Sequence, residues 1–520
     1  MKKTALVSTL ALTASMAAAQ DQDLPQASSE WFTAGQTTIQ EILDRQPNTN
    51  TARNVIVLVA DGNGVGTNYA TRLFVGQQEG GLGEDHVLPY ETPEWYSALV
   101  KTYNINAQTP DSAPTAGAMN TGVKQRFNLI NLGEDAVTGD CRTEDANKLT
   151  TFAEIVSGMD KSVGIVSTAR LTHATPAAVY AKTAYRNWED AIEAPGDEGA
   201  EAAELGELCP NSKDIATQLI DAMEAGTIDL AMGGGRRHFV PEGTETDEGG
   251  EGRRADGTNL IERAQDLGAQ YAWDTATAQE LTLDGSSPIL ALFEDSHMEY
   301  EADRADEEEP SIAEMTRMAI EALSTNENGY YLEVEAGRVD HANHDGNAYR
   351  TLTDGAAFAE AVRVADEMTD DEDTLIIVTA DHEHAIAFNG YCGRGSDILG
   401  LCYEVSNDGI EHSDQPNMAA DGKPYTVLGY LNGTGSVLKE PTEGGNEWTG
   451  SRPDVSQEDA TDMDYIQQAL IPMSSETHSG EDVAVYAKGP YAHLFDGTLE
   501  QNVIFHVMHH AVTADDAAAE

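Results

Sequence analysis

Short apolar runs rich in Val, Ile and Leu recur along the chain and predict buried strands. They lie at 55–60 (VIVLVA), 163–167 (VGIVS), 228–232 (IDLAM), 330–334 (YYLEV), 375–379 (LIIVT) and 483–487 (VAVYA). Between them, apolar residues three or four apart predict helices at 213–225, 311–323 and 354–368. Strands that are apolar throughout are typical of a parallel sheet covered on both faces. The pattern therefore predicts an α/β fold with a large mixed, mostly parallel sheet and helices on both faces.

The polar stretches between these elements predict surface loops. Acidic, Gly-rich segments occupy 187–208, 241–257 and 294–310. The segment at about 389–475 has few periodic runs and many Gly and Asn, and we interpret it as a long insertion at one end of the sheet, forming a cap or a subunit contact. We therefore expect one catalytic domain over 20–520 that carries this insertion.

The N-terminus predicts export. Two lysines precede an apolar, small-residue stretch that ends in three alanines, the pattern of a secretory signal peptide over residues 1–19, and we expect cleavage before Gln20. No later apolar run approaches the ~20 residues that a membrane-spanning helix needs. We expect a soluble protein that is periplasmic or secreted.

The cysteines agree with an oxidising compartment, where disulfides form and persist. There are four of them: Cys141, Cys209, Cys392 and Cys402. Four cysteines allow three pairings, which the sequence does not distinguish. Our prediction is the sequential pairing, Cys141–Cys209 and Cys392–Cys402.

Charge narrows the range of partners. The chain has 90 Asp and Glu against 30 Lys and Arg, a net charge of −60. This charge would repel nucleic acid and anionic membranes, so neither is an expected partner. The chain is also 40% hydrophobic, enough for a large core, so the acidity does not indicate disorder. We interpret it as adaptation to high salt, where ions screen the self-repulsion, over the alternative of an ordinary solvated surface.

Side chains that bind metals gather around the ends of the predicted strands. They are Asp61, His173, Thr175, Glu335, Asp340, His341, His344, Asp381, His382, His384 and His478. The carboxyl ends of parallel strands meet at one edge of the sheet, where α/β proteins bind ligands. Carboxylate oxygens and imidazole nitrogens suit zinc, and a hydroxyl with carboxylates suits magnesium. One Asp after a strand is more often a turn residue, but the whole set predicts a polynuclear metal site.

A candidate nucleophile lies in the segment 109–122 (TPDSAPTAGAMNTG), which predicts a short helix that ends at Gly122. Ser112 then lies at the helix N-terminus, where free N–H groups and the helix dipole favour an anion. A serine there is more commonly an N-cap, but a serine nucleophile would also meet a phosphoryl group at such a place. The segment 233–236 (GGGR) lacks the Lys-Ser/Thr of a phosphate loop, so we interpret it as structural.

These motifs together resemble those of the alkaline phosphatases. They are Asp61-Gly-Asn-Gly, Asp111-Ser-Ala, His173-Ala-Thr-Pro-Ala, Glu335 with Asp340 and His344, Thr379-Ala-Asp-His and Glu476-Thr-His, in order between 54 and 488. The resemblance implies hydrolysis of phosphate monoesters through a phosphoserine intermediate. It also implies two Zn²⁺ and one Mg²⁺ per subunit and a homodimer.

The resemblance implies a role for each matching residue. Ser112 becomes the nucleophile, and Arg186, eleven residues after Thr175, becomes the arginine that grips the phosphate. The first zinc takes Asp340, His344 and His478, the second takes Asp61, Asp381 and His382, and magnesium takes Asp61, Thr175 and Glu335.

Three further histidines are expected beside these ligands. His173 and His341 stand where some bacterial family members carry Asp and Lys, and animal members carry His as this chain does. We place both, with His384, next to the ligands, where they would orient a ligand or a water. A purely structural role is the alternative for each.

Other activities fit the residues less well. A sulfatase needs an arginine four residues after its nucleophile, and position 116 is Ala. A phosphodiesterase of the superfamily would lack the full magnesium set and the phosphate-gripping arginine, whereas Glu335 and Arg186 are present. A non-catalytic acidic protein that binds divalent cations would account for the loops but not for Ser112 and the histidines.

Overall fold

The computed structural model describes residues 24–192, 209–305, 308–439 and 448–517. The predicted signal peptide therefore lies outside the described residues. The chain divides into two compact units, one of Met1–Pro47 with Thr92–Glu94 and one of Asn48–Glu91 with Trp95–Glu520. Helix α2 (Glu30–Asp44) belongs to the first unit, and all other elements described below belong to the second.

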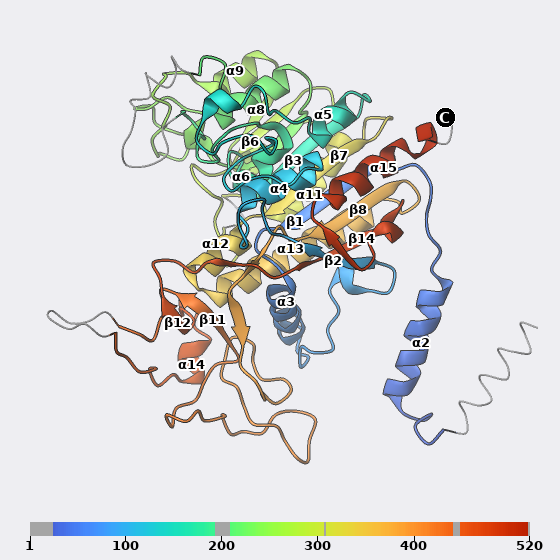
Figure 1. The fold of residues 1–520 in the computed structure, drawn as a ribbon, viewed down its shortest axis with the longest axis vertical. Helices are drawn as coiled ribbons and strands as arrows, with labels where there is room; N and C mark the ends of the chain where they lie inside the picture. The colour runs from blue at the N-terminus through green and yellow to red at the C-terminus, as the bar shows by residue number, and fades with distance from the viewer. Residues whose placement is uncertain (1–23, 193–208, 306–307, 440–447, 518–520) are drawn as a thin grey trace, which may run out of the picture. The chain divides into compact units, whose positions relative to one another are not determined.

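A ten-stranded sheet forms the centre of the second unit (Figure 1). Its order is β15 (Thr498–Glu500), β2 (Tyr96–Lys101), β14 (Val483–Lys488), β8 (Thr374–Thr379), β1 (Asn54–Ala60), β7 (Tyr330–Ala336), β3 (Ser162–Arg170), β4 (Leu230–Gly234), β6 (Ile289–Leu292) and β5 (Gln270–Ala272). Only β14 among these strands runs antiparallel to its neighbours. The prediction of a mixed, mostly parallel sheet is confirmed.

The central strand β1 shows why its residues are apolar without interruption. All seven of its residues are buried, and successive side chains enter two different cores. Val55, Val57 and Val59 face one core, whereas Ile56 and Leu58 face the other. A strand that is buried on both faces has no solvent-facing positions, so polar residues do not alternate with apolar ones.

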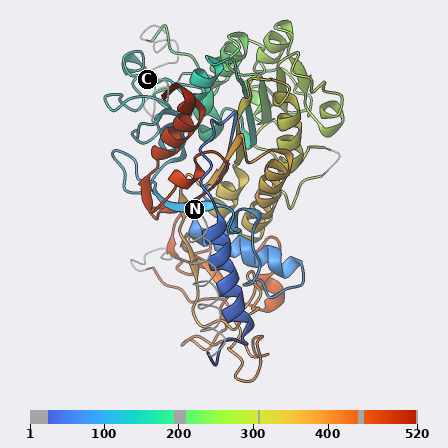
Figure 2. The same ribbon diagram turned by 90° about the vertical axis from the view of Figure 1, so that its right-hand side faces the viewer.

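Helices cover both faces of the sheet (Figures 1 and 2). The core on one face takes residues from α4 (Ser112–Thr121), α5 (Phe152–Ser157), α6 (Ala174–Tyr180), α8 (Ile215–Glu224), α9 (Leu260–Asp266) and α15 (Val503–Ala517). The core on the other face takes residues from α10 (Thr275–Ala278), α11 (Ile312–Leu323), α12 (Arg338–Asp345) and α13 (Ala348–Met368). Helix α3 (Val65–Gln78) packs mainly in a third, smaller cluster. Short 3₁₀ turns lie at Pro89–Glu91, Cys141–Thr143, Arg236–His238 and Ala492–Leu494.

The six predicted strands and three predicted helices all form, with shifted ends. Helix α13 starts at Ala348, six residues before the predicted start at 354, because the Asn347 side chain accepts a hydrogen bond from the Arg350 N–H and caps the helix. Strand β2 was not predicted, because its exposed and buried residues alternate and it lacks a continuous apolar run.

Beyond β8 the chain forms smaller sheets. Strand β9 (Glu383–His384) pairs with β13 (His478–Ser479), and β10 (Ile386–Phe388) pairs with β11 (Leu428–Gly433), which pairs with β12 (Ala469–Pro472). The short helix α14 (Gln457–Ala460) lies between β11 and β12 in sequence. The expectation that about 389–475 is an insertion in a single domain stays a prediction.

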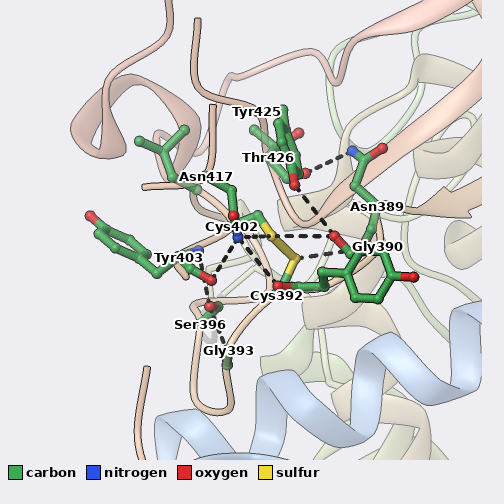
Figure 3. Close-up of a disulfide and its surroundings, with 12 residues drawn as sticks. Asn389, Gly390, Cys392, Gly393, Ser396, Cys402, Tyr403, Asn417, Tyr425 and Thr426 are labelled. Atoms are coloured by element: carbon green, nitrogen blue, oxygen red, sulfur yellow. Dashed lines mark hydrogen bonds between the residues drawn. A yellow bond between two sulfur atoms is a disulfide. The ribbon is translucent and has the colours of Figure 1, made fainter. Parts of the chain in front are cut away.

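Two disulfides have the predicted sequential pairing. Cys141–Cys209 joins Cα atoms 5.8 Å apart, and Cys392–Cys402 joins Cα atoms 4.9 Å apart. Figure 3 shows the second disulfide, where the Asn417 side-chain amide donates to the Tyr403 carbonyl oxygen at 2.9 Å. The Cys392–Cys402 disulfide fixes the start of the segment that follows β10. Within the described residues, no helix combines the length and the apolar character needed to cross a bilayer.

Candidate functional site

The predicted site residues meet at the carboxyl end of the central strands. Strand β1 lies between β7 and β8, so Asp61, which follows β1, lies near Glu335, the last residue but one of β7, and near Asp381, which follows β8. Gly62 then turns the chain with a φ of +68°, and a Cβ at this position would lie 2.4 Å from the His384 ring. Glycine is therefore required beside Asp61, because the turn and the close approach both exclude a side chain.

The first cluster consists of Asp340 and His344 on α12 and His478 on β13. His344 Nε2 and His478 Nε2 each lie 3.3 Å from Asp340 Oδ1 and 3.1 Å from each other. The Nδ1 atom of His344 contacts the Glu476 carbonyl oxygen at 2.6 Å, and that of His478 contacts the Pro110 carbonyl oxygen at 2.9 Å. Because carbonyls accept only, each Nδ1 carries the proton, and both Nε2 lone pairs point at the same place.

Such an arrangement is unfavourable without a cation, since two imidazole lone pairs and a carboxylate oxygen converge on one place. Ligand atoms about 2.0–2.1 Å from a tetrahedral zinc lie roughly 3.3 Å apart, which agrees with the three separations in this cluster. Although burial opposes its ionisation, His344, His384 and His478 hold the pKa of Asp340 well below its ordinary value. The cluster therefore fits a zinc ion.

The second cluster lies around His382 and includes the candidate nucleophile. His382 Nε2 is 3.3 Å from Asp61 Oδ1, 3.3 Å from Asp381 Oδ2 and 3.1 Å from Ser112 Oγ. Burial, followed by His478, lowers the pKa of His382 well below its ordinary value, so its imidazole is neutral and can bind a metal. Asp381 Oδ1 accepts a hydrogen bond from the Gly62 N–H at 3.0 Å, which orients the carboxylate.

Ser112 is the first residue of α4, and the preceding Asp111 is the N-cap residue. The helix ends with Gly122 in the left-handed conformation, at the residue that the sequence predicts. The Ser112 side chain does not cap the helix; it points to His382. The alternative of a simple N-cap serine is therefore excluded, and the hydroxyl is placed at the free N–H groups of a helix start.

The third cluster joins Asp61 to Glu335 on β7 and to α6. Ligand atoms of Asp61, His173 and Glu335 lie within 4.8 Å of one another, and Thr175 is the second residue of α6, which follows the His173 N-cap. Burial raises the pKa of Glu335 to about 8, and burial together with the Asp381 and Asp340 charges raises that of Asp61 well above its ordinary value. A cation would supply the charge that allows both to ionise.

Unpaired polar atoms identify the places where cations would bind. Both Asp61 oxygens, Glu335 Oε1 and Thr175 Oγ1 are buried and have no hydrogen-bond partner in the protein. Buried polar atoms in folded proteins nearly always have a partner, and a bound ion is one way of supplying it. The oxygens of Asp61, Glu335 and Thr175 fit magnesium, which takes oxygen ligands.

Arg186 lies close to the start of α4, where Asp111 is the N-cap residue and Ser112 the first helical residue. Its Nη1 forms an ion pair with Asp111, and its Nη2 donates to His173 Nε2 at 2.9 Å. Asp111 Oδ2 in turn accepts from the Asn128 N–H at 3.1 Å. The guanidinium is thus held from two sides and lies near the first residue of α4.

The three additional histidines have different surroundings. His384 Nε2 lies 2.8 Å from Asp340 Oδ1, and its Nδ1 contacts Glu476, so both nitrogens are engaged. Against the effect of burial, Glu476 and Asp340 raise the pKa of His384 to about 10. It is therefore an imidazolium that orients Asp340, and not a free ligand, although its ring nitrogen lies within 4.8 Å of the ligand atoms of the first cluster. Sequence reasoning quoted Glu476 but gave it no role.

His173 and His341 form a histidine group with His297, which sequence reasoning missed. The His297 ring centroid is 3.9 Å from that of His341 and 5.3 Å from that of His173. His297 lies soon after the carboxyl end of β6, so the rule that found the other residues applied to it. The sequence pattern does not single it out, because the acidic stretch at 294–310 is typical of a surface loop.

Comparisons with known proteins agree with this geometry. Residues 52–514 match the sequence profile of the family described as alkaline phosphatase. The chain is 38% identical to an alkaline phosphatase of Gadus morhua over 92% of this chain and 96% of that protein. It is 39% identical to the tissue-nonspecific isozyme of alkaline phosphatase from Felis catus, over 92% of this chain and 88% of that protein.

Solved structures share the fold. The alkaline phosphatase of Thermus thermophilus has a TM-score of 0.60 at 20% identity, covering 91% of this chain and 93% of that one. The alkaline phosphatase of the Antarctic bacterium TAB5 has a TM-score of 0.57 at 19% identity, covering 89% and 99%. From the family match and the curated relatives, the chain belongs to the alkaline phosphatase family, whose reaction is the hydrolysis of phosphate monoesters.

Proposed function

We propose that this phosphatase acts through Ser112 in two successive displacements. The observation that carries the proposal is the position of Ser112 Oγ, at the first residue of α4 and 3.1 Å from His382 Nε2 in the second cluster. In the first displacement, a bond forms between Ser112 Oγ and phosphorus as the bond from phosphorus to the alcohol oxygen breaks. The proton lost by the serine is balanced by the proton that the alcohol takes up.

In the second displacement, water attacks the phosphoserine from the side that the alcohol has left. The bond from Ser112 Oγ to phosphorus breaks, inorganic phosphate leaves, and the serine regains a proton. Two in-line displacements at one phosphorus require groups that stabilise the oxygens at both apical positions. The first and second clusters are adjacent, because the His478 and His382 rings stack with centroids 3.6 Å apart.

The residues fit two zinc ions and one magnesium ion. Asp340, His344 and His478 would hold one zinc, Asp61, Asp381 and His382 the other, and Asp61, Thr175 and Glu335 the magnesium. When bound, these ions supply charge that stabilises the attacking and leaving oxygens and lowers the pKa of serine and water. Glu476 orients His384, which holds Asp340 in place, and His173 holds Arg186.

Arg186 binds the non-bridging oxygens of the phosphoryl group. Its planar fork can donate two parallel hydrogen bonds, which a lysine cannot reproduce. Asp111 and His173 fix the fork beside Ser112, so little side-chain entropy is lost when the substrate binds. Replacing Arg186 with Ala should weaken phosphate inhibition and turnover together; an unchanged inhibition constant for phosphate would contradict this role.

We also propose that the protein is exported, dimeric and adapted to salt. The N-terminal pattern and the two disulfides support export to an oxidising compartment. The family resemblance supports a homodimer, and the net charge of −60 supports a requirement for screening ions. Sedimentation of the purified protein in dilute buffer and in molar salt tests the last two together, and dissociation or unfolding on adding salt would contradict them.

The direct test is hydrolysis of p-nitrophenyl phosphate at alkaline pH in high salt. Activity is measured before chelation, after chelation, and after zinc and magnesium are returned separately and together. We expect loss on chelation and full recovery only with both metals. No activity in folded protein that contains both metals would contradict the proposed function.

A further inference from the structure

A cavity of about 550 Å³ opens beside the first cluster. His344 lines it, and this side chain is 31% exposed, whereas Asp340 is 5% and His478 14% exposed. Ser475, which precedes Glu476, also lines the cavity. Under the proposed function the first cluster receives the leaving oxygen, so the rest of the alcohol would extend past His344 into this cavity.

Arg338 lines the same cavity without a charged partner. Its guanidinium carbon lies 3.6 Å from the centroid of the Tyr300 ring, and its Nη1 is 3.3 Å from His341 Nδ1. Its Nε is buried and has no hydrogen-bond partner. Among the described residues, no Asp or Glu oxygen lies within the 4.0 Å of an ion pair with Arg338.

Arg350 shows what a structural arginine in this cavity looks like. Its Nε donates to Asp303 Oδ2 at 2.6 Å, and its Nη2 donates to Asp464 Oδ1 at 2.9 Å. The chain has three acidic residues for each basic one, so a carboxylate is easily supplied to an arginine. The absence of one at Arg338 leaves a positive charge without a carboxylate partner beside the cavity, where an anionic ligand can bind it.

The carboxylates of the cavity limit what this ligand can be. Asp303 and Asp464 are neutralised by Arg350, and Asp345 accepts from the Tyr300 hydroxyl at 2.8 Å. Glu299 is a fourth carboxylate in the lining. A polyanion would be repelled by this wall, whereas one additional charge close to the ester could reach Arg338 from the site beside His344.

We propose that Arg338 recognises a second anionic group on the alcohol of the substrate, a carboxylate or a second phosphate. The Tyr300 ring holds the guanidinium by a cation–π contact, and the part of the guanidinium that lines the cavity donates to the anion. The inference rests on the proposed function and adds a class of preferred substrate: phosphate monoesters of short, negatively charged alcohols. Arg338 would therefore determine specificity and leave the phosphoryl chemistry to the three clusters.

The test compares two esters that differ in this charge alone: 2-phosphoglycolate and ethyl phosphate. Each is assayed with the zinc- and magnesium-loaded enzyme in molar salt, which screens repulsion by the acidic surface. The variant is Arg338→Gln, and the matched control is Arg350→Gln, which removes the same charge from the same cavity. We expect the ratio of kcat/KM for phosphoglycolate to that for ethyl phosphate to fall by about tenfold in R338Q and by less than about twofold in R350Q.

A third substrate, ethylene glycol bisphosphate, distinguishes the source of the anion. A larger fall for it than for phosphoglycolate in R338Q assigns a phosphate as the second group, and a smaller fall assigns a carboxylate. Equal losses for charged and neutral esters in R338Q, or an equal change of the ratio in R350Q, would overturn the inference. If the wild-type enzyme hydrolyses neither monoester, the proposed function itself fails.

A binding measurement on the wild-type enzyme tests the same inference and does not depend on whether a variant folds. Phosphonoacetate and propylphosphonate are similar in size and are not hydrolysed, and only the first has a carboxylate. We expect phosphonoacetate to inhibit p-nitrophenyl phosphate hydrolysis at a concentration several-fold lower. Equal inhibition constants would contradict recognition by Arg338.

Discussion

Two buried polar groups lie after strands of the same sheet and differ in one respect. After β4, the buried Arg236 donates to Glu248 at 3.0 Å and to the Trp273 and Leu292 carbonyl oxygens at 3.1 and 2.6 Å. After β1, both carboxylate oxygens of the equally buried Asp61 have no hydrogen-bond partner. Arg236 therefore has its hydrogen-bond partners within the protein, whereas the Asp61 oxygens obtain partners only when a ligand binds.

This difference separates structural from functional polar groups better than burial or charge alone. A buried charge is tolerated when its partners are part of the fold, as they are for Arg236. Where several donors converge without partners, as around Asp61, the fold holds them in place for something that binds. The sequence 233–236 resembles a phosphate loop, yet the completeness of the Arg236 contacts supports its interpretation as structural.

The largest expected effect follows from replacing the nucleophile. Ser112→Ala should lower kcat at least about a thousandfold, because the attacking oxygen is lost. Zinc content should not change, because the metal clusters keep their ligands. Steady-state kinetics and elemental analysis measure both, with Ser157→Ala at the end of α5 as a control. Substantial loss of zinc would mean that Ser112 has a structural role.

Removing the metals should lower the free energy of unfolding, because the site around Asp61 loses its partners, and should leave the contribution of Arg236 unchanged. At a metal concentration a thousandfold above its dissociation constant, binding contributes about 4 kcal/mol to the free energy of unfolding. Denaturant titrations of the zinc-loaded and chelated protein measure this loss. The same loss should appear in an Arg236→Met variant, because its contacts need no metal. An unchanged free energy of unfolding after chelation would refute the claim that the unpaired atoms bind metal.

Arg236→Met should lower the stability of the protein and leave its catalytic activity nearly unchanged. Breaking a buried ion pair leaves Glu248 and Asp295 without their partner and costs about 3–5 kcal/mol of stability. Well below the melting temperature, kcat should stay within about twofold of wild type, since no site residue contacts Arg236. A large fall in kcat with unchanged stability would show that Arg236 has a functional role and not a structural one.

A pH-dependent effect on stability is expected for a buried carboxylate that belongs to neither group. Burial raises the pKa of Asp354 to about 8, and its Oδ2 accepts one hydrogen bond, from the Glu301 N–H at 3.2 Å. Between pH 4 and 8 the folded protein therefore keeps a proton that the unfolded chain releases. Stability from this group is present below pH 4 and is lost as the pH rises to 8.

The Asp354→Asn variant should remove this dependence. The difference in free energy of unfolding between variant and wild type should move in favour of the variant by up to about 1.4 kcal/mol per pH unit between pH 4 and 8. Denaturant titrations across that range provide the measurement. A difference that does not vary with pH would mean that Asp354 is ionised in the folded protein.

The sequence predicts the central part of the sheet because those strands are buried on both faces. Strands β1, β7 and β8 are recognisable from composition alone, and the ligands at their ends follow from the rule for parallel sheets. Strands β5 and β15 have three residues each, too few for any periodicity, and their existence depends on pairing with neighbours.

Contacts between distant residues are the part that the sequence does not reveal. His384 bridges Asp340 and Glu476, which are 44 and 92 residues away, and nothing local in the chain specifies either contact. The Arg338 stack on Tyr300 is of the same kind, because Tyr300 lies in a loop before α11 and Arg338 begins α12. The clusters could be anticipated as a set, but the division between ligands and the residues that orient them needed the structure.

The most direct test of the account is the position of bound zinc, measured by anomalous diffraction at the zinc edge from crystals of the metal-loaded protein. We predict one peak among Asp340, His344 and His478, a second among Asp61, Asp381 and His382, and none at Arg236. Zinc absent from both clusters in an active, metal-replete crystal would contradict the claim that the unpaired polar atoms form the catalytic centre.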